Sequence, residues 1–388
     1  MAGRVAIVAM AQTKYKDSEL AKDYAEMAYE TIEKVTQETG LSWSDVVKSG
    51  FGIDSIVSCS EDFWDGRTIS GAAIQDVAGC HGMDETTVKA DGAQAVYLAT
   101  MQILSGRYDV VLLVGHCKES LTIRSPIDNS GFEPIYQRPL GLHYLPAAAM
   151  QAKLYMHNYG ITEEQFAQVV VKNRGNAKHN PYAQAPLDIT VNDVLNSKIL
   201  TSPIKFLDVK PVSDGSCALI MANEEKAKKL TNKPVWIKGF ASCYDAHYLG
   251  DRDLVACDSL TLAAKQAYAI AGISNPKKEI DVAEIRDEYS YQELLWAECL
   301  GFCARGEGGK LIDEGTTQMN GELPINPSGG MLAGNPTILG GMIRTIEAAV
   351  QLRQEAGERQ IDGAKLALAH GATGPCGQSH CVLILANE

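Results

Sequence analysis

A histidine and a cysteine stand side by side after a run of apolar residues. Val110 to Val114 are five consecutive apolar residues, which predicts a strand buried on both faces, and Gly115 is expected to end it. His116 and Cys117 would then lie at the carboxyl end of the strand, where open α/β sheets bind ligands. A thiolate beside a base can act as a nucleophile. A buried structural cysteine is an equally favoured interpretation, because free cysteines are among the most buried residues.

The composition excludes several classes of function. The chain has 388 residues, 45% hydrophobic and 21% charged, which is typical of two or three domain-sized units around a large core. The formal net charge of -13 argues against a general nucleic-acid or anionic-membrane surface, because both require a cationic face. Any bound anion must therefore meet a local basic cluster.

The cysteines and the first residues indicate the compartment. Ten cysteines are scattered without a C-x-x-C pair, so we expect reduced thiols and no zinc site within the chain. The chain enters a strand at Arg4 without a signal-peptide pattern, and no apolar stretch reaches the length of a membrane span. We expect a cytoplasmic protein.

The elements that must position the chemistry have a repeated order. In the first half we expect strands at 4–10, 53–58, 86–89 and 110–114, with helices at 20–39 and 90–104. In the second half we expect strands at 234–238, 282–286, 365–370 and 381–386, with helices at 260–271, 290–300 and 339–352. This order indicates a duplication in which residues 115–117 and 369–371 occupy corresponding places. Asp91 is favoured as the N-cap of the helix at 90–104 over a catalytic carboxylate.

The segment from Glu119 to about Pro203 has an irregular pattern that predicts an insertion folded over the sheet. A helix is expected at 162–180, with Arg174 and Lys178 on one face. These two cations could hold a phosphate, although a solvated helix face is the default interpretation.

Five motifs, in this order, resemble the thiolase superfamily, and in particular its archaeal and sterol-carrier-protein type. They are YGITEEQFAQVVVKNR at 159–174, NPYA at 180–183, PVSDG at 211–215, GEGG at 306–309 and LPINPSGG at 323–330. The resemblance implies an α/β fold, a duplicated thiolase fold arranged as an αβαβα sandwich with an inserted loop domain, and an obligate dimer. The implied units are 1–118 with 204–235 as the N-terminal half, 119–203 as the insert and 236–388 as the C-terminal half.

The resemblance also implies coenzyme A thioester chemistry, in which a cysteine takes an acyl group and an enolate attacks it in a Claisen condensation, or the reverse cleavage. This chain departs from the family at the decisive places. Lys89 stands where the family has its nucleophilic cysteine, Asn335 stands in the Gly-His-Pro turn, and the Asn-Glu-Ala-Phe element reads Arg286 to Tyr289.

Two cysteines remain as replacements. Cys117 is the predicted nucleophile with His116 or His370 as its base, and Cys376 is the predicted second acid/base. Asn335 can polarise a thioester oxygen but cannot take a proton. His380 is favoured as structural. For coenzyme A, which would be substrate or product rather than a resident cofactor, we expect contacts from Arg174 and Lys178 and from the turn formed by Ser328, Gly329 and Gly330.

Two hypotheses for function follow. The first is a thiolase-like acyl-CoA C-acyltransferase that acts as a homodimer. The resemblance also suggests a small zinc-ribbon/OB-fold subunit as a candidate partner, as in relatives of anaerobic aromatic β-oxidation such as benzoylsuccinyl-CoA thiolase. Any metal would then belong to that partner. The alternative is a thiolase-shaped scaffold or CoA-ester-binding subunit without catalysis, which the changes at Lys89 and Asn335 would explain.

Overall fold

One continuous mixed sheet runs through the computed structural model, which describes residues 3–41, 52–66 and 69–388. Its strand order in the described part is β3-β2-β4-β7-β1-β8-β11-β10-β9. The first-half strands are β1 (Val5–Gln12), β2 (Ser55–Cys59), β3 (Asp84–Val88), β4 (Val110–Lys118) and β7 (Asp214–Asn223). The second-half strands are β8 (Val235–Tyr244), β9 (Val282–Glu284), β10 (Leu366–Thr373) and β11 (Ser379–Ala386). β1 and β8 join the halves by antiparallel pairing of Ala6 with Trp236 and Ile7 with Val235.

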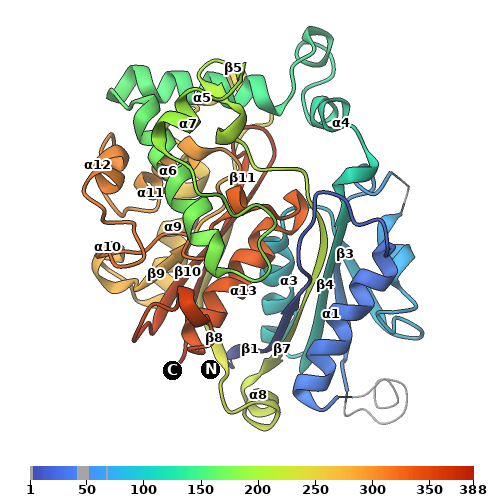
Figure 1. Ribbon diagram of the computed structural model, residues 1–388. Helices are drawn as coiled ribbons and strands as arrows, with labels where there is room; N and C mark the ends of the chain where they lie inside the picture. Colours follow the sequence, from blue (N-terminus) through green and yellow to red (C-terminus); the bar gives the residue numbers. More distant parts are fainter. Residues whose placement is uncertain (1–2, 42–51, 67–68) are drawn as a thin grey trace.

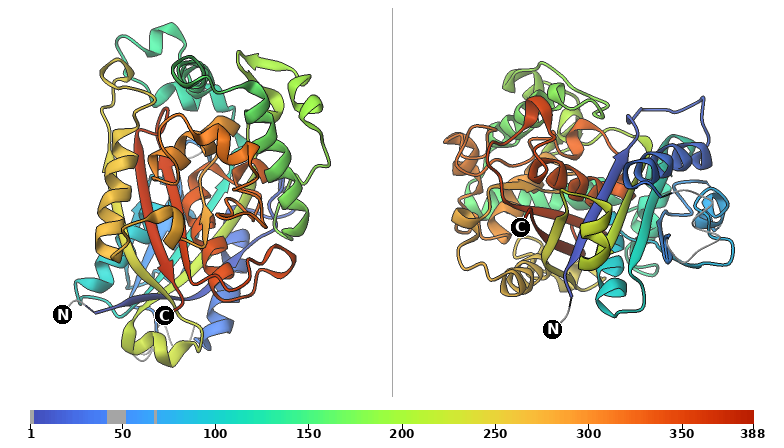
Figure 2. Two further views of the ribbon diagram at one scale, coloured as in Figure 1. Left: turned by 90° about the vertical axis from the view of Figure 1, so that its left-hand side faces the viewer. Right: turned by 90° about the horizontal axis from the view of Figure 1, so that it is seen from below.

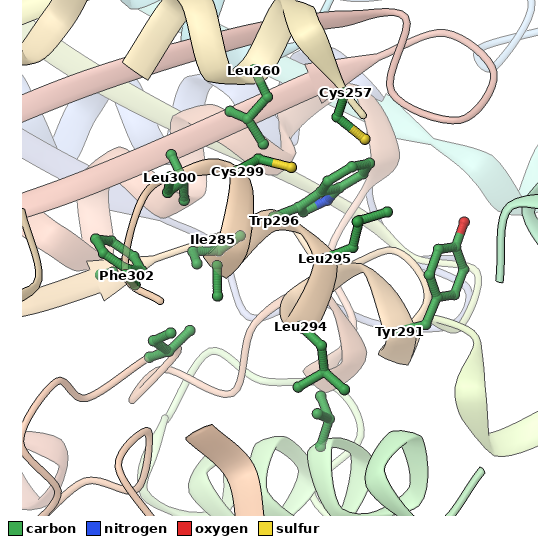
Figure 3. Close-up of a cluster of buried hydrophobic side chains, with 14 of the residues drawn as sticks. Cys257, Leu260, Ile285, Tyr291, Leu294, Leu295, Trp296, Cys299, Leu300 and Phe302 are labelled. Carbon is green, nitrogen blue, oxygen red and sulfur yellow. The ribbon is translucent and has the colours of Figure 1, made fainter. Parts of the chain in front are cut away.

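Helices form three further layers around the two halves of the sheet (Figures 1 and 2). The helices α3 (Gly92–Leu104) and α13 (Gly340–Leu352) lie between the halves and share one hydrophobic core with strands of both. The helix α1 (Tyr24–Thr39) packs on the other face of the first half, near α8 (Glu224–Leu230). The outer face of the second half is covered by α9 (Asp258–Ala271) and α11 (Ser290–Cys299), where Leu260 packs near Leu295 and Trp296 (Figure 3). The five-layer arrangement implied by the resemblance is therefore present.

The strand β4 packs against a hydrophobic core on each of its two faces, which explains its run of apolar residues. Val111 and Leu113 face the central helices, whereas Val110, Leu112 and Val114 face α1. Each face is covered by helices, so alternation of polar and apolar residues is absent.

The prediction that Gly115 ends this strand is wrong. The strand β4 continues to Lys118, and Gly115, His116 and Cys117 pair with residues 217, 216 and 215 of β7. Gly115 is required for close packing instead, because a Cβ at this position would overlap Leu339 of the second half. His116 and Cys117 therefore lie within the last three residues of the strand, paired with β7.

The segment between β4 and β7 lies over the sheet edge at which β4 ends (Figure 1). It contains α4 (Arg124–Ser130), α5 (Tyr144–Tyr159), α6 (Glu163–Asn176), α7 (Val191–Leu195) and a small hairpin of β5 (Ile199–Thr201) and β6 (Ile204–Lys205). The expected helix at 162–180 ends earlier, at Asn176, and Lys178 lies in the following 3-10 turn. The second half also carries α10 (Pro276–Glu279) and α12 (Gly308–Asp313).

Asp91 connects the two central helices. Its side chain accepts a hydrogen bond of 2.9 Å from the Ala93 N–H at the start of α3, as the N-cap prediction requires. It also accepts one of 3.0 Å from the Gly341 N–H at the start of α13. One carboxylate therefore satisfies the free N–H groups of two buried helix ends.

Within the described ranges, no helix has the length and apolar character needed to cross a bilayer.

Candidate active site

A polar cavity of about 270 Å³ lies where the first half, the insert and the second half meet. The first half contributes Lys89 and Asp91, the insert contributes Asp128 and Tyr144, and the second half contributes Arg286 with its neighbour Glu288. Such a convergence of titratable groups from distant segments is typical of an active site.

A smaller inner cavity of about 20 Å³ adjoins the polar cavity. The two share Tyr144, Arg286, Glu288 and Gly374 as lining residues, and the inner cavity is further lined by Trp296 and Cys376. Cys376 follows β10 in a turn where its φ is +53°, and Arg252 holds this turn by donating to the Cys376 carbonyl at 3.0 Å. Among the described residues that line these two cavities, Cys376 is therefore the cysteine, and it lies next to the polar cavity.

A third, apolar cavity of about 410 Å³ opens on the other side of Asp128. Its lining includes Leu145, Phe206, Val209 and Val212, together with Arg174. It meets the polar cavity at Asp128 and the inner cavity at Tyr289.

Charged groups that line the polar cavity, together with Arg124 beside it, form a connected series of ion pairs. Arg286 lies 3.6 Å from Asp91 and 3.5 Å from Glu288, and Arg124 contacts both Glu288 and, at 3.0 Å, Asp128. Burial raises the pKa of Glu288, but Arg124 and Arg286 outweigh it and hold the pKa at about 2. Glu288 therefore stays ionised at neutral pH.

Two carboxyl groups in this series of ion pairs have pKa values near neutral pH. Burial raises the pKa of Asp91 to about 6, and burial likewise raises the pKa of Asp128 to about 6, with Arg286 and Arg124 respectively opposing the shift. Lys89 stands at the cavity rim and pairs with Asp62 at 2.6 Å. The cavity thus combines a fixed anion, cations and carboxyls that can exchange protons.

Cys117 lies away from these cavities. It has no exposed surface, packs in the core beside the central helices, and lines none of the three cavities formed by the described residues. Burial raises the pKa of its thiol well above the ordinary value. His116 faces the other side, with Nε2 3.0 Å from Asp65 Oδ2. Neither Cys117 nor His116 therefore lines any of the three cavities described above.

His370 and His380 form a buried stacked pair. His370 Nε2 lies 2.9 Å from His380 Nδ1, and both rings pack against Trp296. Burial lowers the pKa of both histidines, that of His380 to about 3. The two histidines therefore form a neutral buried pair that packs against Trp296, a lining residue of the inner cavity.

The two cations predicted to contact coenzyme A, Arg174 and Lys178, lie in different surroundings. Arg174 lines the apolar cavity, and burial lowers its pKa to about 10. Lys178 instead pairs with the exposed Asp188 at 3.0 Å.

The turn at 328–330 is occupied by internal contacts. Ser328 donates hydrogen bonds to the Glu284 carboxylate from both its N–H and its hydroxyl. Gly329 packs against α6, and Gly330 lies against Asp287. Asn335 is buried and donates to the Gly330 carbonyl at 3.1 Å. These residues shape the second half and line none of the three cavities within the described structure.

The sequence interpretation named none of the polar cavity's lining residues as site residues, and Asp128 and Tyr144 were not quoted in any motif. Both come from the irregular insert, and the only local signal was the four-residue spacing between Arg124 and Asp128, which suits an ion pair on one helix face. In the described part of the chain, no group of three or more His, Cys, Asp or Glu residues could hold a metal ion.

Comparisons with known proteins identify the family. Residues 241–387 match the family model described as thiolase C-terminal domain-like. The acetyl-CoA acetyltransferase of Methanothermobacter thermautotrophicus is 35% identical over 315 residues, covering 79% of this chain and 82% of the relative. Benzoylsuccinyl-CoA thiolase subunit BbsB of Thauera aromatica is 29% identical over 294 residues, 74% of each chain.

A solved structure supports the same assignment. The Ltp2-ChsH2(DUF35) aldolase superposes with a TM-score of 0.84 at 28% identity and covers 99% of this chain and 98% of that one. The predicted fold and family are confirmed: this chain belongs to the thiolase superfamily, as a thiolase-like member related to the acyl-CoA acyltransferases.

Proposed function

We propose that this chain makes or breaks a carbon–carbon bond next to the carbonyl of a coenzyme A thioester, as a thiolase-like acyl-CoA acyltransferase. One observation carries the proposal: positions that match three separate motifs of the family meet at the polar cavity. These are Lys89 of the first half, Arg286 with Glu288 of the second half and, through the inner cavity, Cys376. Protonatable groups and cations there suit the charge that develops on thioester and enolate oxygens.

We assign the pantetheine arm of coenzyme A to the apolar cavity. Its lining is largely apolar, and it ends at Asp128, where it meets the polar cavity. Arg174 in the wall of this cavity supplies a cation for the phosphate groups of coenzyme A. An acyl group carried on this arm would enter the polar cavity beside Asp128.

We assign the nucleophile to Cys376 rather than to Cys117. The Cys376 sulfur would attack the thioester carbonyl, so that a new S–C bond forms, the bond to coenzyme A breaks and the thiol proton passes to the departing coenzyme A thiolate. Burial raises the pKa of Cys376 to about 12, so this step requires that proton transfer during the attack.

Intact-mass measurement after incubation with acetyl-CoA tests the nucleophile. We expect a protein mass increase equal to one acetyl group in the wild type and in Cys117→Ser, and none in Cys376→Ser. Both variants change one sulfur to oxygen, so each is the matched control for the other. An adduct that disappears in Cys117→Ser and persists in Cys376→Ser would refute the assignment.

A second candidate function is aldol-type cleavage without an acyl-enzyme. It is favoured by the polar cavity itself, since no cysteine is among its described lining residues and Lys89 replaces the usual thiol. The 28% identical relative whose structure bears the name aldolase supports it. In that case no adduct forms with any variant, while a 3-hydroxyacyl-CoA is split into a carbonyl compound and a shorter acyl-CoA. If the wild type forms no acetyl adduct and cleaves no 3-hydroxyacyl-CoA, the remaining hypothesis is the non-catalytic scaffold.

We also propose a small partner subunit and a homodimer of this chain in the cytoplasm. One relative is named as a subunit of its thiolase, and the similar solved structure is named with a DUF35 protein. The adduct and cleavage measurements are therefore made with the chain alone and with a co-expressed DUF35-type protein.

A further inference from the structure

We propose that Asp128, on the helix α4 of the insert, is the acid/base residue that removes and returns the proton on the carbon next to the thioester carbonyl. This inference rests on the proposed function, and it adds a catalytic residue that matches none of the motifs by which the chain resembles its family.

The position of Asp128 is the first argument. Of the described residues, it alone lines both the apolar cavity and the polar cavity. If the pantetheine arm occupies the apolar cavity, the thioester and its neighbouring carbon reach the polar cavity at this residue. A base at the junction is therefore beside the carbon that must lose a proton.

The two carboxylate oxygens of Asp128 have different surroundings. Oδ2 accepts a hydrogen bond of 3.0 Å from Arg124 Nε, which fixes the orientation of the carboxyl. Oδ1 is buried and has no hydrogen-bond partner among the described residues, although the Asp128 side chain is only 3% exposed. Oδ1 is thus a buried acceptor without a partner beside the cavity, and a substrate proton would supply the partner that it lacks. Burial raises the pKa of Asp128 to about 6, so the carboxylate is both ionised at neutral pH and basic enough to accept that proton.

The other carboxyls at the cavity suit this step less well. Glu288 is neutralised by two guanidinium groups that hold its pKa at about 2, so it is a weak base. Asp91 accepts the N–H groups of Ala93 and Gly341 with its two oxygens. Of Asp91, Asp128 and Glu288, Asp128 is the carboxylate at the junction of the polar and apolar cavities, and its Oδ1 has no partner among the described residues.

The step balances without any further reactant. The C–H bond next to the thioester carbonyl breaks, its proton forms an O–H bond with Asp128 Oδ1, and the electron pair forms the enolate, with negative charge on the thioester oxygen. Return of the proton from Asp128 regenerates the thioester. In condensation the enolate attacks the acyl carbonyl held on Cys376, so that a C–C bond forms, the S–C bond to Cys376 breaks and the proton on Asp128 passes through solvent to the released thiolate. In cleavage the steps run in reverse, and protonated Asp128 returns its proton to the departing enolate.

Several charged or titratable groups lie around Asp128 and influence its pKa. They are Arg124 of its own helix, Glu119 before it, Tyr144 and His143 at the start of α5, Arg286 and Glu288 of the second half, Lys210 and Arg174 across the apolar cavity, and Lys89, Asp91 and Glu61 across the polar cavity. Removing the Arg124 cation is expected to raise the pKa of Asp128.

Deuterium exchange into acetyl-CoA in D2O tests the proposal, with mass spectrometry following the acetyl group. We expect the wild-type rate to fall as the pH drops through about 6, because the base becomes protonated. Asp128→Asn should lower the rate at least 100-fold without lowering the melting temperature, and Asp128→Glu should restore part of it. Asp188→Asn, an exposed aspartate in the same insert, should leave the rate unchanged.

The outcomes separate this inference from the function on which it rests. Exchange by the wild type that persists within about threefold in Asp128→Asn overturns the role of Asp128 and leaves the proposed function standing. No exchange by the wild type, alone or with a co-expressed partner, overturns the proposed function and this inference with it. If Asp128→Asn does not fold, Arg124→Gln decides the question: the acidic limb of the rate profile moves to higher pH if Asp128 is the base and stays in place if it is not.

Discussion

Replacing Lys172 with methionine is expected to destabilise the protein by about 3 to 5 kcal/mol, because it leaves a buried carboxylate without its cation. Lys172 Nζ, on α6 of the insert, lies 2.5 Å from Glu293 Oε1 on α11, and neither side chain is more than 1% exposed. Among the described residues, Glu293 would keep only the amide donors of Asn173 and Asn326. Equilibrium unfolding in urea, followed by circular dichroism, measures the loss.

An exposed ion pair provides the matched control. Lys228 pairs with Glu224 on α8 at 2.6 Å, with the Lys228 side chain 62% exposed. Lys228→Met should change the free energy of unfolding by less than about 1 kcal/mol. Adding Glu293→Leu to Lys172→Met should recover stability, because the unpaired charge is then removed. Equal losses in Lys172→Met and Lys228→Met would contradict the buried pair as the link between insert and second half.

Gly371→Ala is expected to lower the free energy of unfolding by about 1 to 3 kcal/mol or more, and to displace the residues at the N-terminal end of α3. Gly371 lies in β10, where an added Cβ would overlap Asp91 Oδ1 and Ala93 Cβ. Asp91 caps both central helices and lines the polar cavity, so its displacement should lower activity together with stability. Thermal unfolding and turnover of an acyl-CoA measure the two effects.

Gly175→Ala is the control for this substitution. Gly175 lies inside α6, and an added Cβ meets no described atom within 4 Å. Alanine there should raise the free energy of unfolding by up to about 1 kcal/mol, because alanine favours the helix over glycine. A Gly371→Ala variant as stable and active as wild type would contradict the tight packing between β10 and the start of α3.

The sequence predicted most of the fold, because local patterns determine it. Apolar runs and helical spacing located the strands and helices of both halves, and the Asp91 cap followed from its side-chain chemistry. The end of β4 could not be predicted in this way. Three polar or small residues continue the strand because β7, about 100 residues further on, supplies hydrogen-bond partners and Leu339 requires a glycine. Long-range pairing therefore outweighed the local effect of Gly115.

The candidate site was only partly predictable for the same reason. Cys376 was predicted as a site residue from the family's C-terminal motif, and it lines the inner cavity. Lys89 and Arg286 were noted only as departures from family motifs, yet both line the polar cavity. Asp128 and Tyr144 were missed because the insert has no periodic pattern, and only its packing over the sheet brings them to the cavity. Cys117 was proposed from its place after an apolar run, but the longer strand carries it into the core.

A crystal structure of the wild-type protein with a non-reactive thioether analogue of acetyl-CoA tests the central claim most directly. We expect the pantetheine arm in the apolar cavity, the thioether beside Asp128, and the acetyl group in the polar cavity within contact of Arg286 or Cys376. An analogue bound with its acetyl group elsewhere, with both cavities empty, would contradict the assignment of coenzyme A thioester chemistry to this site.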